Sequence, residues 1–214
     1  MIIIATAGSK QSGKSTLCTY LKSVLAVRYG DCRIYAWADS LKKFCIDILG
    51  LSNEQCYGEE EQKNIPTRYS WDRMPLEVRM QNSLDKVNPR SGIMTARNIM
   101  QVAGTDIIRN LFSDDIWINA TLKHIETDQP DVALISDTRF KVEIDSLLKY
   151  PRSYIIKLNR KPFEDIHKGE KDLDDYNFSN LKWLNRHIII NNMNMDIHEK
   201  EKEVLKFLKE KSLL

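Results

Sequence analysis

The sequence predicts an α/β fold, in which a five-stranded parallel sheet lies between two layers of helices. Short β-branched runs alternate with segments of helical periodicity along the chain. Several of these runs are apolar on both faces, as strands buried beneath helices on both sides must be. With 214 residues, 42% of them hydrophobic, the chain is long enough to bury a full core. We therefore expect a single three-layer α/β/α domain over residues 1–214.

Five runs carry the strand pattern, and they are Ile2–Ala7, Arg33–Ala38, Val132–Ser136, Ser153–Leu158 and His187–Ile190. A helix is expected between the first two strands, because Leu17, Leu21 and Val24 follow the spacing of one helical face. A second helix is expected near the C-terminus, where Ile197 and Val204 begin an apolar stripe among Lys and Glu residues of a solvated face. The predicted core comprises residues 1–50, 95–159 and 187–214.

Two segments interrupt this pattern. Residues 51–94 contain several glycines and prolines among charged residues, and only a helix from Pro75 to about Val87 is expected within them. We interpret this segment as an insertion that binds the acceptor substrate. Residues 160–186 are rich in charge and include His167, Lys168 and Glu170, so we expect a lid that closes over the substrates.

Composition limits the partners. A formal charge of +2, from 32 basic and 30 acidic residues spread along the chain, gives no basic patch for nucleic acid or for an anionic membrane. Four cysteines without zinc-ligand spacing indicate free thiols in a reducing cytoplasm. The longest apolar stretches, such as Met1–Ala7, are far below the roughly 20 residues that cross a bilayer. We expect small-molecule partners, and a homodimer is left open.

The strongest motif is Gly8-Ser9-Lys10-Gln11-Ser12-Gly13-Lys14-Ser15, which matches G-x-x-x-x-G-K-[ST] between a strand and a helix. Such a loop turns its backbone N–H groups toward the phosphates of a nucleotide, and the helix N-terminus adds partial positive charge. Lys14 is expected to reach the β- and γ-phosphates, and Ser15 to bind Mg²⁺. The predicted nucleotide-binding residues are Gly8, Lys10, Ser12, Gly13, Lys14, Ser15 and Thr16.

The strand Val132–Ser136 is followed by Asp137, the position at which enzymes with this loop hold Mg²⁺ through water. Thr138 and Arg139 come next, so the second acid that water-activating ATPases place there is absent. No Asn-Lys-x-Asp guanine-binding motif occurs, which argues against a GTPase. Arg139 can point into the crevice at the carboxyl edge of the sheet, and we predict that it clamps a phosphate.

Three residues are candidates for the acceptor. Arg97 and Gln101 lie four positions apart on one helical face, with a guanidinium suited to a phosphate and an amide suited to a base edge. Asp39 follows the second strand and could orient the acceptor or Mg²⁺, act as a general base, or cap the helix that begins near Ser40. Arg160, at the start of the expected lid, is the candidate lid cation.

Four blocks, taken in order, resemble the phage-type deoxynucleoside monophosphate kinases, the family that includes the enzyme of T-even bacteriophages. They are Gly8 to Ser15, Arg97 to Asp106 with Trp117 after it, Ser136 to Arg139, and His167 to Glu170 before Ile190-Asn191-Asn192. The resemblance implies a phage or phage-derived gene and, for a phage, a place in the host cytoplasm. Residues 51–94 align with no motif of that family, and the base preference stays open.

Together these observations predict transfer of the γ-phosphate of ATP, with Mg²⁺, to the 5′-phosphate of deoxynucleoside monophosphates. Lys14, Arg97, Asp137, Arg139 and Arg160 are the predicted catalytic residues. One alternative is a deoxynucleoside kinase, whose hydroxyl acceptor would need Asp39 as a base. Another is an ATPase of this class that acts as a switch or as a packaging subunit.

Overall fold

The computed structural model describes residues 1–80, 88–160, 173, 176–178 and 186–214. The chain divides into two compact units, one formed by Met1–Trp37 with Thr121–Leu214 and the other by Ala38–Ala120. The second division falls within helix α7 (Ile116–Asp128). The second unit extends beyond the predicted insertion on both sides, and the predicted boundaries of domain, insertion and lid stay predictions.

The first unit is built on a five-stranded parallel sheet with the strand order β2-β5-β1-β6-β7. The strands are β1 (Ile2–Ala7), β2 (Cys32–Tyr35), β5 (Val132–Thr138), β6 (Ser153–Leu158) and β7 (His187–Ile190). β1 is central and buried along its whole length, with Ile4 opposite Leu134 on one side and Tyr154 on the other. The predicted α/β class with five parallel strands is confirmed.

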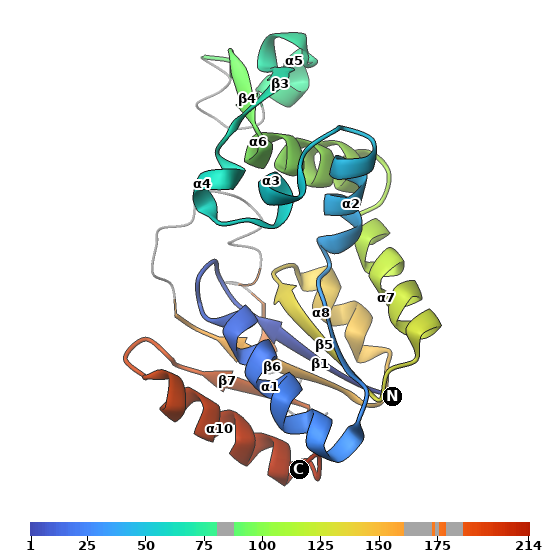
Figure 1. Ribbon diagram of the computed structural model, residues 1–214, viewed down its shortest axis with the longest axis vertical. Coiled ribbons are helices and arrows are strands. Elements are labelled where there is room, and N and C mark those ends of the chain that lie inside the picture. Colours follow the sequence, from blue (N-terminus) through green and yellow to red (C-terminus); the bar gives the residue numbers. More distant parts are fainter. Residues whose placement is uncertain (81–87, 161–172, 174–175, 179–185) are drawn as a thin grey trace. The chain divides into compact units, whose positions relative to one another are not determined.

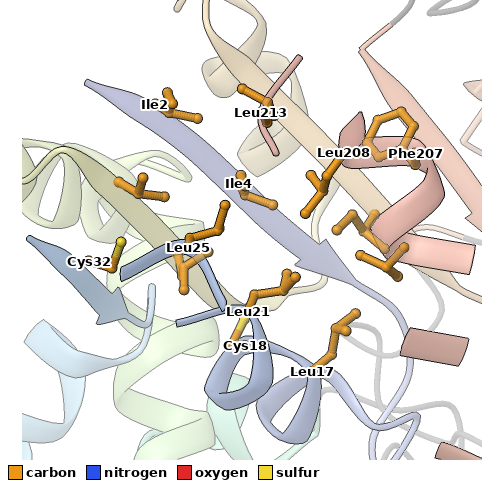
Figure 2. Close-up of a cluster of buried hydrophobic side chains, with 14 of the residues drawn as sticks. Ile2, Ile4, Leu17, Cys18, Leu21, Leu25, Cys32, Phe207, Leu208 and Leu213 are labelled. Atoms are coloured by element: carbon orange, nitrogen blue, oxygen red, sulfur yellow. The ribbon is translucent and has the colours of Figure 1, made fainter. Parts of the chain in front are cut away.

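Helices cover both faces of this sheet (Figure 1). On one face, Ile2 and Ile4 pack in one buried cluster with apolar side chains of α1 (Lys14–Tyr29) and α10 (Ile197–Glu210), as Figure 2 shows. On the other face, Ala7 and Ile155 pack against Ile144 of α8 (Lys141–Leu148). This alternation follows from the period of two along a strand. The first unit therefore has the predicted three layers.

The second strand begins and ends earlier than the predicted Arg33–Ala38. After Tyr35 the backbone leaves the sheet ladder, because the N–H of Trp37 donates to the carboxylate of Asp137 at 2.7 Å. The Trp37 indole N–H donates to the hydroxyl of Thr138 at 3.0 Å, and the side chain is buried. These bonds hold the end of the β2 segment against the end of β5.

The second unit contains more regular structure than the sequence predicted. Its elements are α2 (Asp39–Asp47), α3 (Asn53–Tyr57), α4 (Glu60–Lys63), β3 (Pro66–Ser70), a 3-10 turn (Trp71–Arg73), α5 (Leu76–Arg79), β4 (Ile93–Thr95), α6 (Ala96–Gln101) and the π-helix η2 (Val102–Arg109). The expectation of a single helix between Leu51 and Met94 is wrong, because β3 pairs antiparallel with β4 and α3 and α4 precede it (Figure 1). α5 coincides with the first turn of that expected helix, and residues 81–87 lie outside the described part.

This unit has its own apolar core. Trp71 and Met94 are buried together with Cys45, Cys56 and Ile99, which come from α2, α3 and α6. Capping boxes begin two of the short helices, at Ser52 for α3 and at Thr95 for α6. Local caps and one shared core therefore stabilise elements that are too short to be stable alone.

Only part of the predicted lid can be described. Leu173 and Phe178 are buried against Ala7, Ile144 and Ile155 of the first unit. His167, Lys168 and Glu170, which the sequence places in the expected lid, lie outside the described residues. Across the described residues, the structure has no helix that is both long and apolar enough to span a membrane.

Candidate active site

The glycine-rich loop after β1 requires its glycines for conformational reasons. Gly8 has φ of +149°, and a Cβ at this position would lie 2.6 Å from the backbone oxygen of Leu158. Gly13 has φ of +95°, in the region that side chains disfavour, and it directly precedes α1. Gln11 also has a positive φ, of 56°. The motif thus corresponds to a tight loop that only these residue types permit.

Lys14 lies inside the loop. Its side chain is 6% exposed, and its ammonium donates to the carbonyl oxygens of Gly8 at 2.7 Å and Ser9 at 2.6 Å. The hydroxyl of Ser12 is buried without a hydrogen-bond partner in the described part of the chain. Phosphate oxygens are stronger acceptors than carbonyls for an ammonium group, so Lys14 can exchange its loop partners for a nucleotide.

The remaining predicted nucleotide-binding residues surround the start of α1. Ser15 and Thr16 lie in its first turn and are exposed, and Lys10 is half-buried at the tip of the loop. No acidic residue occupies this first turn, so its open N–H groups face no competing carboxylate of their own helix. This end of α1 is suited to an anion.

Asp137 lies near the end of β5 and is half-buried. Burial raises the pKa of the Cys18 thiol to about 11, the bond with Thr6 lowers it, and the charges of Asp137 and Lys14 act on it in opposite directions. Both charges therefore lie near the same point of α1. The hydroxyl of Ser15 and the carboxylate of Asp137 are hard oxygen ligands of the kind that Mg²⁺ takes, so these residues fit the ion.

Arg139 and Arg160, the two arginines of this unit predicted to bind phosphate, differ in their exposure to solvent. Arg139 is half-buried after β5, and its backbone N–H donates to the carboxylate of Glu143 at 2.8 Å, which fixes the start of α8. Arg160 is exposed at the end of β6, and its backbone N–H donates to the side-chain oxygen of Asn192 at 2.9 Å. The two residues follow the carboxyl ends of β5 and β6, the strands on either side of β1, and ligands of open α/β sheets bind at this edge.

Asn192 connects three segments of the first unit. Its side-chain oxygen accepts from Arg160, and its side-chain nitrogen donates to the carbonyl of Ser12 at 2.9 Å. The residue is 4% exposed and lies between β7 and α10. It ties the phosphate-binding loop to the segments after β6 and β7. Asn192 belongs to one of the four blocks that resemble the kinase family, but the sequence alone predicts no role for it.

In the second unit, Arg97 is held by acidic and amide groups of α4 and its end. Its guanidinium pairs with the carboxylate of Glu60 at 2.6 Å, and its Nε donates to the side chain of Asn64 at 3.4 Å. The Arg97 and Glu60 side chains are 29% and 40% exposed. Gln101, one turn later at the end of α6, is also half-buried. The predicted one-face arrangement places both side chains at the partly exposed surface of α6.

Two lysines share the surroundings of Arg97, and sequence reasoning missed both. Burial and then the charge of Lys42 lower the pKa of Lys63, Arg97 acts in the same direction, and Glu60 opposes them. The Lys42 ammonium also lies 4.4 Å from the centre of the Tyr57 ring. Three cations thus gather in this part of the second unit. They come from α2, α4 and α6, so their spacing in the sequence carries no signal of their proximity.

Asp39 does not cap α2. It is the first residue of the helix, and Ala38 occupies the N-cap position without a side-chain hydrogen bond. Burial and a hydrogen bond with the Asp39 carboxylate raise the pKa of Tyr57 to about 12. The capping alternative is therefore wrong, and the carboxylate is engaged by a residue of α3.

The fold and the glycine-rich loop together indicate the class of protein. A parallel sheet in which the central strand runs into a glycine-rich loop, with a buried lysine in that loop and an Asp near the end of the adjacent strand β5, is the arrangement of P-loop enzymes that bind nucleoside triphosphates.

Within that class, residues 41–200 match the family model described as deoxynucleotide monophosphate kinase, and the chain belongs to this family. It is therefore a kinase, an enzyme that transfers phosphate. The chain is 29% identical over 186 residues to a protein of Acanthamoeba polyphaga mimivirus named putative deoxynucleotide monophosphate kinase, covering 81% of this chain and 82% of the relative. It is 26% identical over 175 residues to the deoxynucleoside-5′-monophosphate kinase of Escherichia phage T5, covering 66% of this chain and 70% of that enzyme.

Proposed function

We propose that the chain transfers the γ-phosphate of MgATP to the 5′-phosphate of deoxynucleoside monophosphates, which gives ADP and deoxynucleoside diphosphates for DNA synthesis. Membership of the family supports the acceptor class. The observation that supports a nucleoside triphosphate donor is the buried ammonium of Lys14 inside the glycine-rich loop. ATP and deoxynucleotides are metabolites of the cytoplasm, so the proposal places the reaction there, in the host if the gene belongs to a phage.

The reaction needs positioning and charge neutralisation rather than a base. The acceptor oxygen is already anionic near neutral pH, and the transition state spreads negative charge over the transferred group. We assign Lys14, Arg139 and Arg160 to the donor phosphates and the transferred group. Arg97 holds the acceptor phosphate, and Gln101 reads the acceptor base.

Bound Mg²⁺ would neutralise part of the charge of the donor phosphates. The hydroxyl of Ser15 and the carboxylate of Asp137 would hold it. The bond from the Trp37 N–H fixes the orientation of the Asp137 carboxylate. This assignment uses only hard oxygen ligands, which suits Mg²⁺ better than a softer metal.

The two alternatives have less support. A deoxynucleoside kinase would need a base for its hydroxyl acceptor, and the carboxylate of Asp39 is instead bonded to Tyr57, whose pKa it raises. An ATPase that acts as a switch or packaging subunit needs no acceptor. Arg97 and its neighbouring cations would then have no substrate.

Coupled ADP release from MgATP tests the proposal, with the four common deoxynucleoside monophosphates, their ribose counterparts and the free deoxynucleosides as acceptors. We expect turnover with one or more deoxynucleoside monophosphates. Turnover with free deoxynucleosides alone would support the first alternative. Hydrolysis that is independent of every acceptor and rises with added DNA would support the second.

An arginine variant tests the assignment of the acceptor site. Arg97→Met is expected to raise the KM for the deoxynucleotide more than about tenfold, because a charge-assisted bond to phosphate is lost, with little change in the KM for ATP. Arg73→Met, at an exposed arginine of the same unit, is the matched control and should change neither value. An unchanged acceptor KM in Arg97→Met would remove Arg97 from the site.

A further inference from the structure

Lys200 lies in the first turn of α10 and is buried in the first unit. The residue is 5% exposed, although its neighbours Glu201 and Lys202 on the helix are partly or fully exposed. A lysine at such a position normally has an acidic partner, because an unpaired buried charge is costly. Within the described part of the chain, no carboxylate lies at ion-pair distance from its ammonium.

The ammonium of Lys200 lies beside the phosphate-binding loop. A Cβ placed on Gly13 would come within 3.0 Å of the Lys200 Nζ, and it would meet no other group within 4 Å. Gly13 directly precedes Lys14 at the start of α1, the end of the helix that carries partial positive charge. Asn192 ties the segment before α10 to the same loop through the carbonyl of Ser12. The position of Lys200 is therefore fixed relative to the loop.

Among the described residues, the charges that act on Lys200 leave a positive excess. Burial lowers the pKa of its side chain, Glu201 opposes this effect, and the positive charge of Arg160 adds to it. Arg160, Lys200 and the start of α1 thus bring positive charge to one end of the loop. Repulsion among these positive charges is unfavourable in the unliganded protein. The same charges favour the binding of an anion that carries several negative charges.

We propose that Lys200, beside Gly13, is a second cation for the phosphate chain of the donor nucleotide and acts together with Lys14. The inference rests on the proposed function, because it names a further binding residue for the donor of that reaction. It assigns to α10 a direct part in binding that its Lys- and Glu-rich sequence does not suggest. The ligand chemistry is that of a nucleoside di- or triphosphate.

Calorimetric titration of the full chain tests this assignment with Mg²⁺-bound ATP and ADP, and with adenosine. Lys200→Met keeps the length and the apolar stem of the side chain and removes its charge. We expect its affinity for ATP and ADP to fall about ten- to hundredfold, the range for a lost charge-assisted bond, and its affinity for adenosine to stay unchanged. Lys202→Met, at an exposed position of the same helix, should match the wild type.

A conservative variant separates charge from structure. Lys200→Arg should retain most of the affinity for ATP, and Lys200→Gln, which also removes the charge, replaces the Met variant in the comparison if that variant does not fold. Unchanged binding of ATP by Lys200→Met, or an equal loss of ATP and adenosine binding, would overturn the assignment. Binding is measured without an acceptor, so a chain that binds ATP through Lys200 but phosphorylates no deoxynucleotide would refute the proposed reaction alone.

Discussion

Glu60 holds the guanidinium that we assign to the acceptor phosphate. Its carboxylate lies 2.6 Å from Arg97, at a distance typical of a charge-assisted bond. An acceptor phosphate offers the same chemistry with more charge and would compete with Glu60 for Arg97. The nearby cations Lys42 and Lys63 favour the more highly charged competitor. If Arg97 binds the acceptor as we propose, we expect the acceptor phosphate to displace Glu60 from it.

Glu60→Gln should lower the KM for the deoxynucleotide about two- to fivefold, because the ion pair that competes for Arg97 is partly exposed and worth little. The KM for ATP should not change. Steady-state kinetics with each substrate varied in turn measures both values. Glu61→Gln, at an exposed position of the same helix, is the control. A higher acceptor KM in Glu60→Gln would mean that Glu60 positions Arg97 for the substrate rather than competing with it.

The sequence predicted the position of a site residue where that position depends only on its distance from the end of a strand or the start of a helix. The loop glycines, Lys14 and Asp137 sit at fixed offsets from a strand end or a helix start, so a motif locates them. Lys63 and Lys200 were not predictable, because their proximity to other charges arises from the packing of distant segments. In the sequence, Lys200 is one of several lysines on an amphipathic helix.

At the scale of elements, α1 links the loop to the core. Its apolar face, with Leu17, Leu21 and Leu25 fully buried, packs on the sheet (Figure 2) and so holds in place the helix start that follows the loop. The sequence predicted Leu17 and Leu21 on this face and named Val24 as the next residue, whereas the structure buries Leu25 and leaves Val24 partly exposed. The two-faced apolar pattern of β1 and β6 was predicted correctly. β3, α3 and α4 were missed, because elements of four or five residues are too short to show a period.

Leu21→Ala should reduce the free energy of unfolding by about 2–5 kcal/mol, because a fully buried side chain leaves a cavity between α1 and the sheet. Val27→Ala on the same helix removes a side chain that is 90% exposed and should change the stability by less than about 0.5 kcal/mol. Denaturation in urea followed by circular dichroism compares the two. Equal effects would show that α1 is not packed as described.

The π-helix η2 depends on a close approach at Gly104. A Cβ at this position would lie 2.3 Å from a methyl carbon of Leu41, and the Gly104 carbonyl accepts a bond from the Trp117 indole at 3.0 Å. Gly104→Ala should therefore destabilise the protein by about 1–3 kcal/mol, as overpacking does, despite the better helix propensity of alanine.

A double-mutant cycle locates the cause. In the Leu41→Ala background the obstructing methyl group is absent, so Gly104→Ala should cost close to nothing. Chemical denaturation of the four proteins measures the coupling. If Gly104→Ala reduced the free energy of unfolding equally in both backgrounds, contact with Leu41 would not be the cause of the destabilisation.

At the scale of the whole molecule, the chain divides into two compact units rather than forming a single one. The sequence predicted one domain with an insertion over residues 51–94, whereas the compact second unit spans Ala38–Ala120. The difference arises because Cys45 of α2 and Val102 of η2 share a core with Trp71, which residue patterns within each helix cannot reveal. The residues that we propose for the donor belong to the first unit, and Arg97 and Gln101, which we propose for the acceptor, belong to the second.

The stability of the molecule should depend on pH through Lys200. Its pKa in the folded chain is lowered from the ordinary lysine value of 10.5, first by burial. Between the lowered value and 10.5, the unfolded chain binds the proton that the folded chain has lost, so this residue makes the free energy of unfolding rise with pH. At pH values below the lowered pKa, Lys200 is charged in the folded chain, and burial of this charge reduces the free energy of unfolding by its full amount. Lys200→Met lacks this contribution.

Without nucleotide, Lys200→Met should therefore be more stable than the wild type at neutral pH, and its advantage should shrink as the pH approaches 10.5. Urea denaturation of both proteins at a series of pH values measures this difference in the free energy of unfolding. The contributions of the other titrating groups are the same in both proteins and cancel in the difference. Saturating ATP should reverse the order at neutral pH, because the ligand pairs with the charge in the wild type alone. A difference that is constant with pH would mean that the Lys200 ammonium is solvated in the folded chain.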